Sequence, residues 1–249
     1  MKCRTVIVSA LCVSLLALGG RASAEVIIDE LFDANSLIES PLSSAMVGMS
    51  NMGMWMGGTS MGDGMWQVMY VPGSMSMYQA MGSVNMGTGM GMTASWNSLV
   101  YFVGKPRTGW GGNRLGFSFD YHTEDLPNGL AAKFGVYGWK GGETLNLESE
   151  DPSGGGFPLI EGNLTNGSEW HTVGGSFSGD LDPFNFIGAT FTIGDTTADG
   201  NPVSLEIDNI KADVVPEPVS TLLWAAAWAT TACVLGRVRK RRNAASPAK

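Results

Sequence analysis

The sequence is poor in cysteine, and the long segment between its two ends has none. The three cysteines are Cys3, Cys12 and Cys233, so all of them lie outside the segment from Glu25 to Val215. Neither disulfides nor thiolate metal sites are therefore available to this segment. Its stability must come from a packed hydrophobic core.

Histidine and catalytic motifs are also scarce. His122 and His171 are the only histidines, and no nucleophile elbow, zinc-protease motif or phosphate-binding loop accompanies them. Carboxylates are plentiful, so chance pairs are expected, and the sequence does not show the separation that glycoside hydrolysis requires. The sequence predicts a protein that is not an enzyme. The carboxylates considered for such a pair are Asp120, Glu124, Asp125, Glu148, Glu150 and Asp151.

Basic residues are rare in the same central segment. Glu25 to Val215 contains 22 acidic and six basic residues, whereas the two termini contain nine of the fifteen basic residues. An acidic surface repels phosphate backbones, which disfavours nucleic acid as a partner.

The N-terminus has the pattern of a secretory signal peptide over residues 1–24. Lys2 and Arg4 form the charged start, the apolar stretch runs from Val6 to Leu18, and Ala22 to Ala24 form a small-residue cleavage site. This pattern predicts export and a mature chain that begins at Glu25.

The C-terminus combines a proline-rich linker, an apolar run and a basic cluster. Pro216 and Pro218 end any preceding strand. Val219 to Gly236 gives 18 uncharged residues, about 27 Å of helix against a hydrocarbon core of about 30 Å, so we predict a transmembrane helix within 218–236. The positive-inside rule places the tail, 243–249, in the cytoplasm and the body outside. The cluster consists of Arg237, Arg239, Lys240, Arg241 and Arg242.

This order of linker, span and basic end, over residues 215–242, resembles the PEP-CTERM sorting signal of bacterial export systems. The resemblance implies that an exosortase recognises Pro216, Glu217 and Pro218 and processes the chain nearby. A simple stop-transfer anchor with the same three residues is the alternative.

The body, residues 25–214, reads as short strands separated by Gly, Pro, Asn and Asp. Leu115, Phe117, Phe119 and Tyr121 alternate with polar or small residues, as in a half-buried strand. We therefore predict a mainly β fold, an antiparallel β-sandwich of the jelly-roll kind. The expected strands are 25–32, 66–71, 96–103, 115–121, 131–139, 143–147, 169–177, 187–193 and 203–212.

A Met- and Gly-rich segment, residues 46–92, contains all fourteen methionines other than Met1. Val84 to Met92 alternates apolar residues with glycine or other small residues, which suggests a strand with a thioether face. Three interpretations stay open: methionine as a core filler, a soft-metal site for Cu(I), and partial disorder. Copper binding predicts loss of the metal when Met86, Met90 and Met92 become Leu.

The last strands, from Glu169 to Lys211, resemble those of galactose-binding-like jelly rolls, which include many carbohydrate-binding modules. The resemblance implies a structural calcium where the first and last strands meet, with Asp208 and either Asp29 or Glu30 as ligands.

Sugar binding requires an exposed aromatic ring near hydrogen-bonding groups. Trp110, in a glycine-rich loop, meets this requirement in the sequence, with Trp139 and Tyr121 as further candidates. We therefore expect an exported, non-catalytic surface or matrix protein that contacts extracellular polysaccharide. A structural or adhesive protein without a specific ligand, and a copper-binding protein, are the alternatives.

Overall fold

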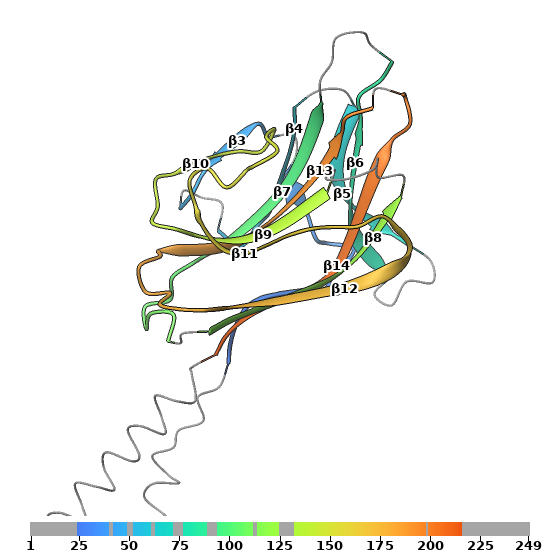
Figure 1. Cartoon of the computed structure of the whole chain (residues 1–249). Helices are drawn as coiled ribbons and strands as arrows, with labels where there is room; N and C mark the ends of the chain where they lie inside the picture. The colour runs from blue at the N-terminus through green and yellow to red at the C-terminus, as the bar shows by residue number, and fades with distance from the viewer. Residues whose placement is uncertain are drawn as a thin grey trace, which may run out of the picture. The chain divides into compact units, whose positions relative to one another are not determined.

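The computed structural model describes residues 24–39, 42–48, 52–60, 63–71, 77–88, 94–111, 114–124, 132–197 and 199–215. The predicted signal peptide, sorting signal and transmembrane helix lie outside these residues. Glu25–Val214 forms one compact unit (Figure 1). Within the described ranges, no helix is both long and apolar enough to cross a membrane.

The first sheet, sheet A, contains six strands, and its registered pairs are antiparallel. Its order is β12-β8-β14-β6-β5, and β1 also pairs with β14. The first and last strands of the described body therefore lie side by side. The strands are β1 (Glu25–Glu30), β5 (Asp63–Tyr70), β6 (Tyr78–Asn85), β8 (Arg114–Glu124), β12 (Gly167–Ser178) and β14 (Val203–Val215).

The second sheet, sheet B, also has six strands, in the order β11-β9-β13-β7-β4-β2. Only the short pairing of β2 with β4 is parallel among the registered pairs of this sheet. The strands are β2 (Ile38–Glu39), β4 (Trp55–Thr59), β7 (Ser95–Gly104), β9 (Ala132–Trp139), β11 (Phe157–Asn163) and β13 (Phe186–Asp195).

The main core lies between the two sheets. Alternate residues of β8 point inward, and Phe119 meets Phe191 of β13 and Phe134 of β9, with both pairs of ring centroids 5.0 Å apart. Fully burying a large apolar side chain stabilises a fold by about 1.5–3 kcal/mol. This cysteine-free body therefore has the packed core that it needs.

A smaller core covers part of the outer face of sheet B. Here β3 (Ser44–Met46) pairs with β10 (Thr144–Asn146) in a two-stranded sheet. Leu145 and Leu147 pack with Phe102 and Trp139, which face outward from sheet B. Beside this cover, Thr190 and Thr192 of β13 also face outward and are buried.

The predicted class is confirmed in its coarser part: the described body is mainly β, with antiparallel sheets arranged as a sandwich. The jelly-roll connection and the two hydrophobic ends stay predictions. The strand expected over Val84 to Met92 is wrong in extent, because β6 ends at Asn85. The chain turns there, since Gly87 has φ +66° and its amide donates to the Asn85 side chain at 2.8 Å. The sequence analysis did not identify β11, the edge strand that ends sheet B next to β9.

The described methionines range from buried to exposed, with Met54, Met69 and Met81 half-buried. Met56 and Met86 are buried, and Met56 belongs to the smaller core, which agrees with methionine as a core filler at these positions. Met90 and Met92 lie outside the described residues, so copper binding stays a prediction. The exposed methionines are Met46, Met52, Met65 and Met77.

Candidate functional site

Trp110 is not an exposed sugar-binding residue, and that prediction is wrong. The side chain is 1% exposed, and its indole N–H donates to the carbonyl of Phe184 at 2.9 Å. Gly109 and Gly111 have positive φ angles. Such backbone angles suit glycine, and at these two positions they let the chain turn so that the ring points into the core. The glycines that suggested an uncovered ring instead permit its burial.

Trp139 and Tyr121 are buried as well, so neither offers a ring face to a sugar. Trp139 is 1% exposed and donates its indole N–H to the Ser153 carbonyl at 2.6 Å. Tyr121 faces the main core, and its hydroxyl lies 3.2 Å from that of Thr165. Buried tyrosine and tryptophan usually find such a polar partner.

Two of the three candidate calcium ligands, Glu30 and Asp208, have separate hydrogen-bond partners. Glu30 accepts the indole N–H of Trp55 at 3.1 Å, and Asp208 accepts the backbone N–H of Asn209 at 2.7 Å. Asp29 is exposed on β1. Across the described ranges, no three acidic or histidine side chains are placed to hold a metal ion. The calcium site stays a prediction.

A groove of about 190 Å³ lies on the open part of the outer face of sheet B. Neighbouring strands β9 and β13 form its floor, and the loop from Glu148 to Gly156 forms one wall. We call it the sheet B groove. Its polar side chains include Lys133, Glu150, Asp151, Glu161, Thr190 and Thr192.

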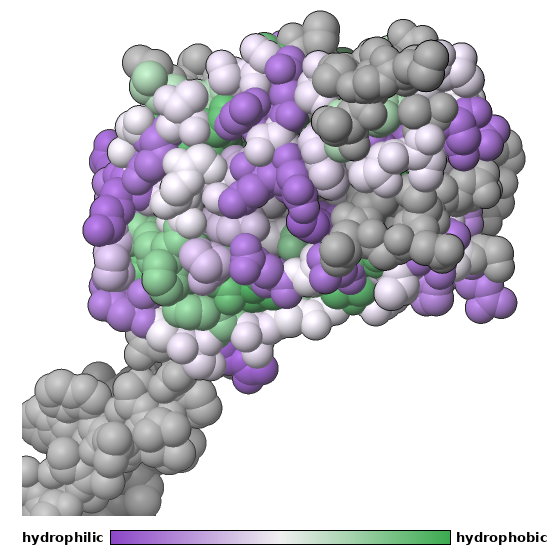
Figure 2. All heavy atoms as spheres, turned by 45° about the horizontal axis from the view of Figure 1, so that its top comes forward, coloured by the Kyte–Doolittle hydropathy of each residue, from purple (hydrophilic) through white to green (hydrophobic). Residues whose placement is uncertain are grey.

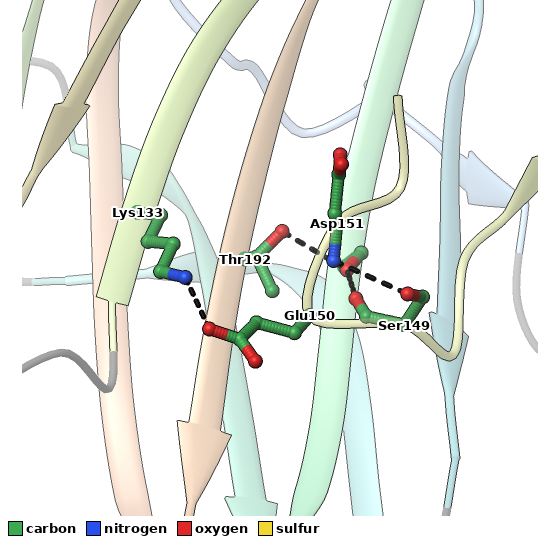
Figure 3. A network of polar contacts seen from close by, with 6 residues as sticks. Lys133, Ser149, Glu150, Asp151 and Thr192 are labelled. Atoms are coloured by element: carbon green, nitrogen blue, oxygen red, sulfur yellow. Dashed lines mark hydrogen bonds and ion pairs between the residues drawn. The ribbon is translucent and has the colours of Figure 1, made fainter. Parts of the chain in front are cut away.

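Lys133 joins the floor of the sheet B groove to its wall. Its ammonium group pairs with the carboxylate of Glu150 (Figure 3). The same group lies 6.0 Å from the centre of the Trp96 ring. Thr192 stands opposite Lys133 in the register of β9 and β13. Ser98, Thr192 and Lys133 therefore form one row across β7, β13 and β9. Trp96 lies two residues away from this row along β7, and Glu150 reaches Lys133 from the loop.

Glycine lets the Trp96 ring lie against the sheet. Trp96 of β7 is paired with Gly194 of β13. A Cβ added at Gly194 would lie 2.3 Å from the ring, closer than real contacts allow. The indole therefore covers the glycine and reaches toward Lys133, and it remains half-exposed. Such a fixed ring is a stacking surface for a ligand.

Tyr137 is placed in the same way beside the other end of the groove. Its ring covers Gly135 of its own strand, and its hydroxyl donates to Glu161 of β11 at 2.7 Å. Burial raises the pKa of Tyr137 above its ordinary value, and the hydrogen bond to Glu161 raises it further. Tyr137 therefore stays neutral and holds the Glu161 carboxylate in position.

The wall of the groove is tied to the sheet by hydrogen bonds. The Ser98 hydroxyl donates to the Ser149 carbonyl at 3.3 Å and also lies 3.1 Å from the Thr192 hydroxyl (Figure 3). Further along, the Trp139 indole holds the Ser153 carbonyl. Polar loop groups are thereby fixed above a sheet, which reduces the entropy lost when a ligand binds.

Chemically, the sheet B groove suits hydrogen bonding and stacking. Glu150 and Asp151 were considered as part of a catalytic pair, and both line the groove together with Glu161. Trp96, Lys133 and Glu161 were not predicted as site residues. Trp96 lies near the start of a strand with apolar residues on both faces, and such a pattern does not indicate which rings lie beside a groove.

The comparisons with known proteins give a fold likeness and no family. No family model matches the chain, and no curated protein matches it. The CBM22-1 xylan-binding domain of Xyn10C from Paenibacillus barcinonensis aligns with a TM-score of 0.41 and 10% identity, over 78% of this chain and 97% of that chain. A cleaved adhesin domain of Lys-gingipain from Porphyromonas gingivalis gives 0.37 and 15%, over 76% and 98%.

The enzymatically active domain of tailspike protein 4 from bacteriophage CBA120 gives a TM-score of 0.42 and 11% identity, over 67% of this chain and 20% of that chain. The chain thus spans about a fifth of the tailspike chain. The described body belongs to the class of antiparallel β-sandwich domains. All three TM-scores are below 0.5, so the functional conclusion depends on the groove itself.

Proposed function

We propose that this is an exported, non-catalytic protein of the cell surface or matrix that binds polysaccharide in the sheet B groove. The observation that carries the proposal is the Trp96 ring, fixed over Gly194 beside Lys133. A sugar stacks its apolar face on such a ring, and its hydroxyls form hydrogen bonds with neighbouring polar groups. Glu150 and Glu161 line the groove and are exposed, so their carboxylates can accept these hydrogen bonds.

The charge of the groove favours a neutral polysaccharide. Glu150, Asp151 and Glu161 outnumber Lys133, and Lys133 is already paired with Glu150. Carboxylates accept hydrogen bonds from sugar hydroxyls, whereas they repel uronate, sulfate or phosphate groups. The visible face in Figure 2 is largely hydrophilic, with small apolar patches, as expected for a body that works in water.

Export and sorting form the second half of the proposal and depend on the two ends of the sequence. A signal peptide over 1–24 directs the chain out, and a PEP-CTERM signal over 215–242 presents Pro216 to Pro218 to an exosortase. The apolar run from Val219 to Gly236 holds the chain in the membrane until processing.

Affinity electrophoresis of the purified protein in gels that contain xylan, β-1,4-galactan or hydroxyethylcellulose tests the binding. We expect retardation by at least one of these neutral polysaccharides, and Trp96→Ala should weaken it about tenfold or more, because stacking is lost. Tyr70→Ala is the matched control, since Tyr70 is an aromatic residue 55% exposed on edge strand β5. A structural protein without a ligand would show no retardation, and equal effects of both changes would remove the groove from the proposal.

Cell fractionation tests the sorting. Replacing Pro216, Glu217 and Pro218 together by Ala should leave the chain exported but unprocessed in the membrane fraction. If the altered and natural chains are processed alike, the tail acts as a plain anchor. This outcome would leave polysaccharide binding untouched.

A further inference from the structure

The outer face of sheet A carries a second aromatic surface, on the side of the sandwich away from the sheet B groove. Trp170 of edge strand β12 is 41% exposed. Its ring stacks on the imidazole of His122 from β8, with centroids 5.8 Å apart and an angle of 29° between the planes. One face of the indole is therefore supported by protein, and the opposite face is available to a ligand.

Glu206 of the central strand β14 supports the stack from below. Its Oε2 lies 3.3 Å from Nδ1 of His122, and the two side chains are only 19% and 13% exposed. Nδ1 of His122 forms no hydrogen bond within the described residues, so packing beside Glu206, and not a hydrogen bond, holds the imidazole against the indole. The ring of Trp170 is thus preorganised, which limits the entropy that a bound ligand would have to overcome.

Hydrogen-bonding groups lie next to this ring. Thr172 stands opposite Asp120 in the register of β12 and β8, and its hydroxyl donates to Asp120 at 2.6 Å. Asn209 of β14 donates its side-chain amide to the other oxygen of the same carboxylate at 3.1 Å. A stacking ring followed by a row of hydroxyl, carboxylate and amide groups matches the alternating apolar and polar surface of a sugar chain.

We propose that Trp170, His122 and Glu206 form a second polysaccharide-binding site, and that the protein joins two polysaccharide chains. The inference rests on the proposed function of the sheet B groove. Sheets A and B share one core, so their outer faces point in opposite directions. One short oligosaccharide cannot reach both sites, whereas two separate chains can each occupy one.

Crosslinking is the measurable consequence. The protein is titrated with an oligosaccharide of whichever neutral polysaccharide retards it in the gels, and it is then mixed with the intact polysaccharide while turbidity is followed. We expect about two sites per protein and a rise in turbidity, because linked sites multiply the avidity for a polymer. Trp170→Ala and Trp96→Ala should each leave about one site and abolish the turbidity.

Trp170→Tyr is the matched variant, because it keeps an aromatic ring and should retain crosslinking in part. Circular dichroism confirms that each variant is folded. The inference is refuted if Trp170→Ala gives the same turbidity as the unaltered protein. It is also refuted if Trp96→Ala removes all binding, because the sheet B groove is then the single site. If the unaltered protein binds none of the polysaccharides, the proposed function fails first.

Discussion

Replacing Trp139 by Phe should loosen the wall of the sheet B groove. The change removes the hydrogen bond from the indole to the Ser153 carbonyl, which contributes about 0.5–1.5 kcal/mol. It also leaves a cavity of about 40 Å³, which costs about 1 kcal/mol at about 24 cal/mol per Å³. The Ser153 carbonyl still accepts the amide of Gly156 at 3.0 Å, so it is not left without a donor. We expect a total loss of about 1.5–2.5 kcal/mol, or about 3–10 °C in Tm.

Trp110→Phe is the matched control for this prediction. Trp110 is equally buried and also donates its indole N–H to a backbone carbonyl, that of Phe184. Urea unfolding should show that both changes lower the free energy of unfolding. The loss in Trp110→Phe should be at least as large as the loss in Trp139→Phe.

Hydrogen exchange separates the two variants. Loss of about 1 kcal/mol of local anchoring should speed exchange of the Gly156 amide about fivefold in Trp139→Phe, whereas Trp110→Phe should leave this amide unchanged relative to global stability. Equal exchange at Gly156 in the two variants would show that Trp139 does not fix the wall, and the reasoning would be refuted.

Two further predictions concern stability. Gly188→Ala should lower the free energy of unfolding by about 2–3 kcal/mol, because the new Cβ would lie 2.3 Å from the Tyr101 carbonyl oxygen. Gly174→Ala is the control and should cost little, since the atom nearest to its new Cβ is 3.5 Å away. Urea unfolding measures both changes, and a larger loss for Gly174→Ala would contradict this packing. The raised pKa of Tyr137 predicts stabilisation that is complete below pH about 10 and declines as the pH rises from there through the folded value. At pH 8, Tyr137→Phe should be less stable than the unaltered protein by about 1.5–3 kcal/mol, because the hydrogen bond to Glu161 is lost. This difference in stability should narrow above pH 10. A difference that stays constant with pH would refute the raised pKa of Tyr137.

The strands of the body were largely predictable, because their side chains alternate between a buried and a polar face. β8 is the clearest case: Leu115, Phe117, Phe119 and Tyr121 all face the core. The short strands β2, β3 and β4 were not predictable from the sequence. β2 and β3 have only two and three residues, too few to show an alternating pattern, and β4 has apolar residues or glycine on both faces.

The binding residues were predicted poorly for a different reason. Glycine next to tryptophan was taken to uncover the ring, as for Trp110, but the same pairing can bury it. What places the Trp96 ring beside Lys133 is Gly194, almost a hundred residues away in sequence and adjacent only through the register of β7 and β13. A single sequence does not contain that pairing, whereas it did locate Glu150 and Asp151 in an acidic loop.

The position of β14 has a mechanical consequence. This last strand of the body is bordered by β6 and β8, and β1 also pairs with it, from Glu25 opposite Val214 to Glu30 opposite Ile210. Tension applied at Val215 acts along the strand. The hydrogen bonds to the flanking strands are therefore loaded together in shear, and they do not break one after another. If the body is held by its C-terminal end, an external pull on it is therefore carried by a strand that is hydrogen-bonded to three neighbours.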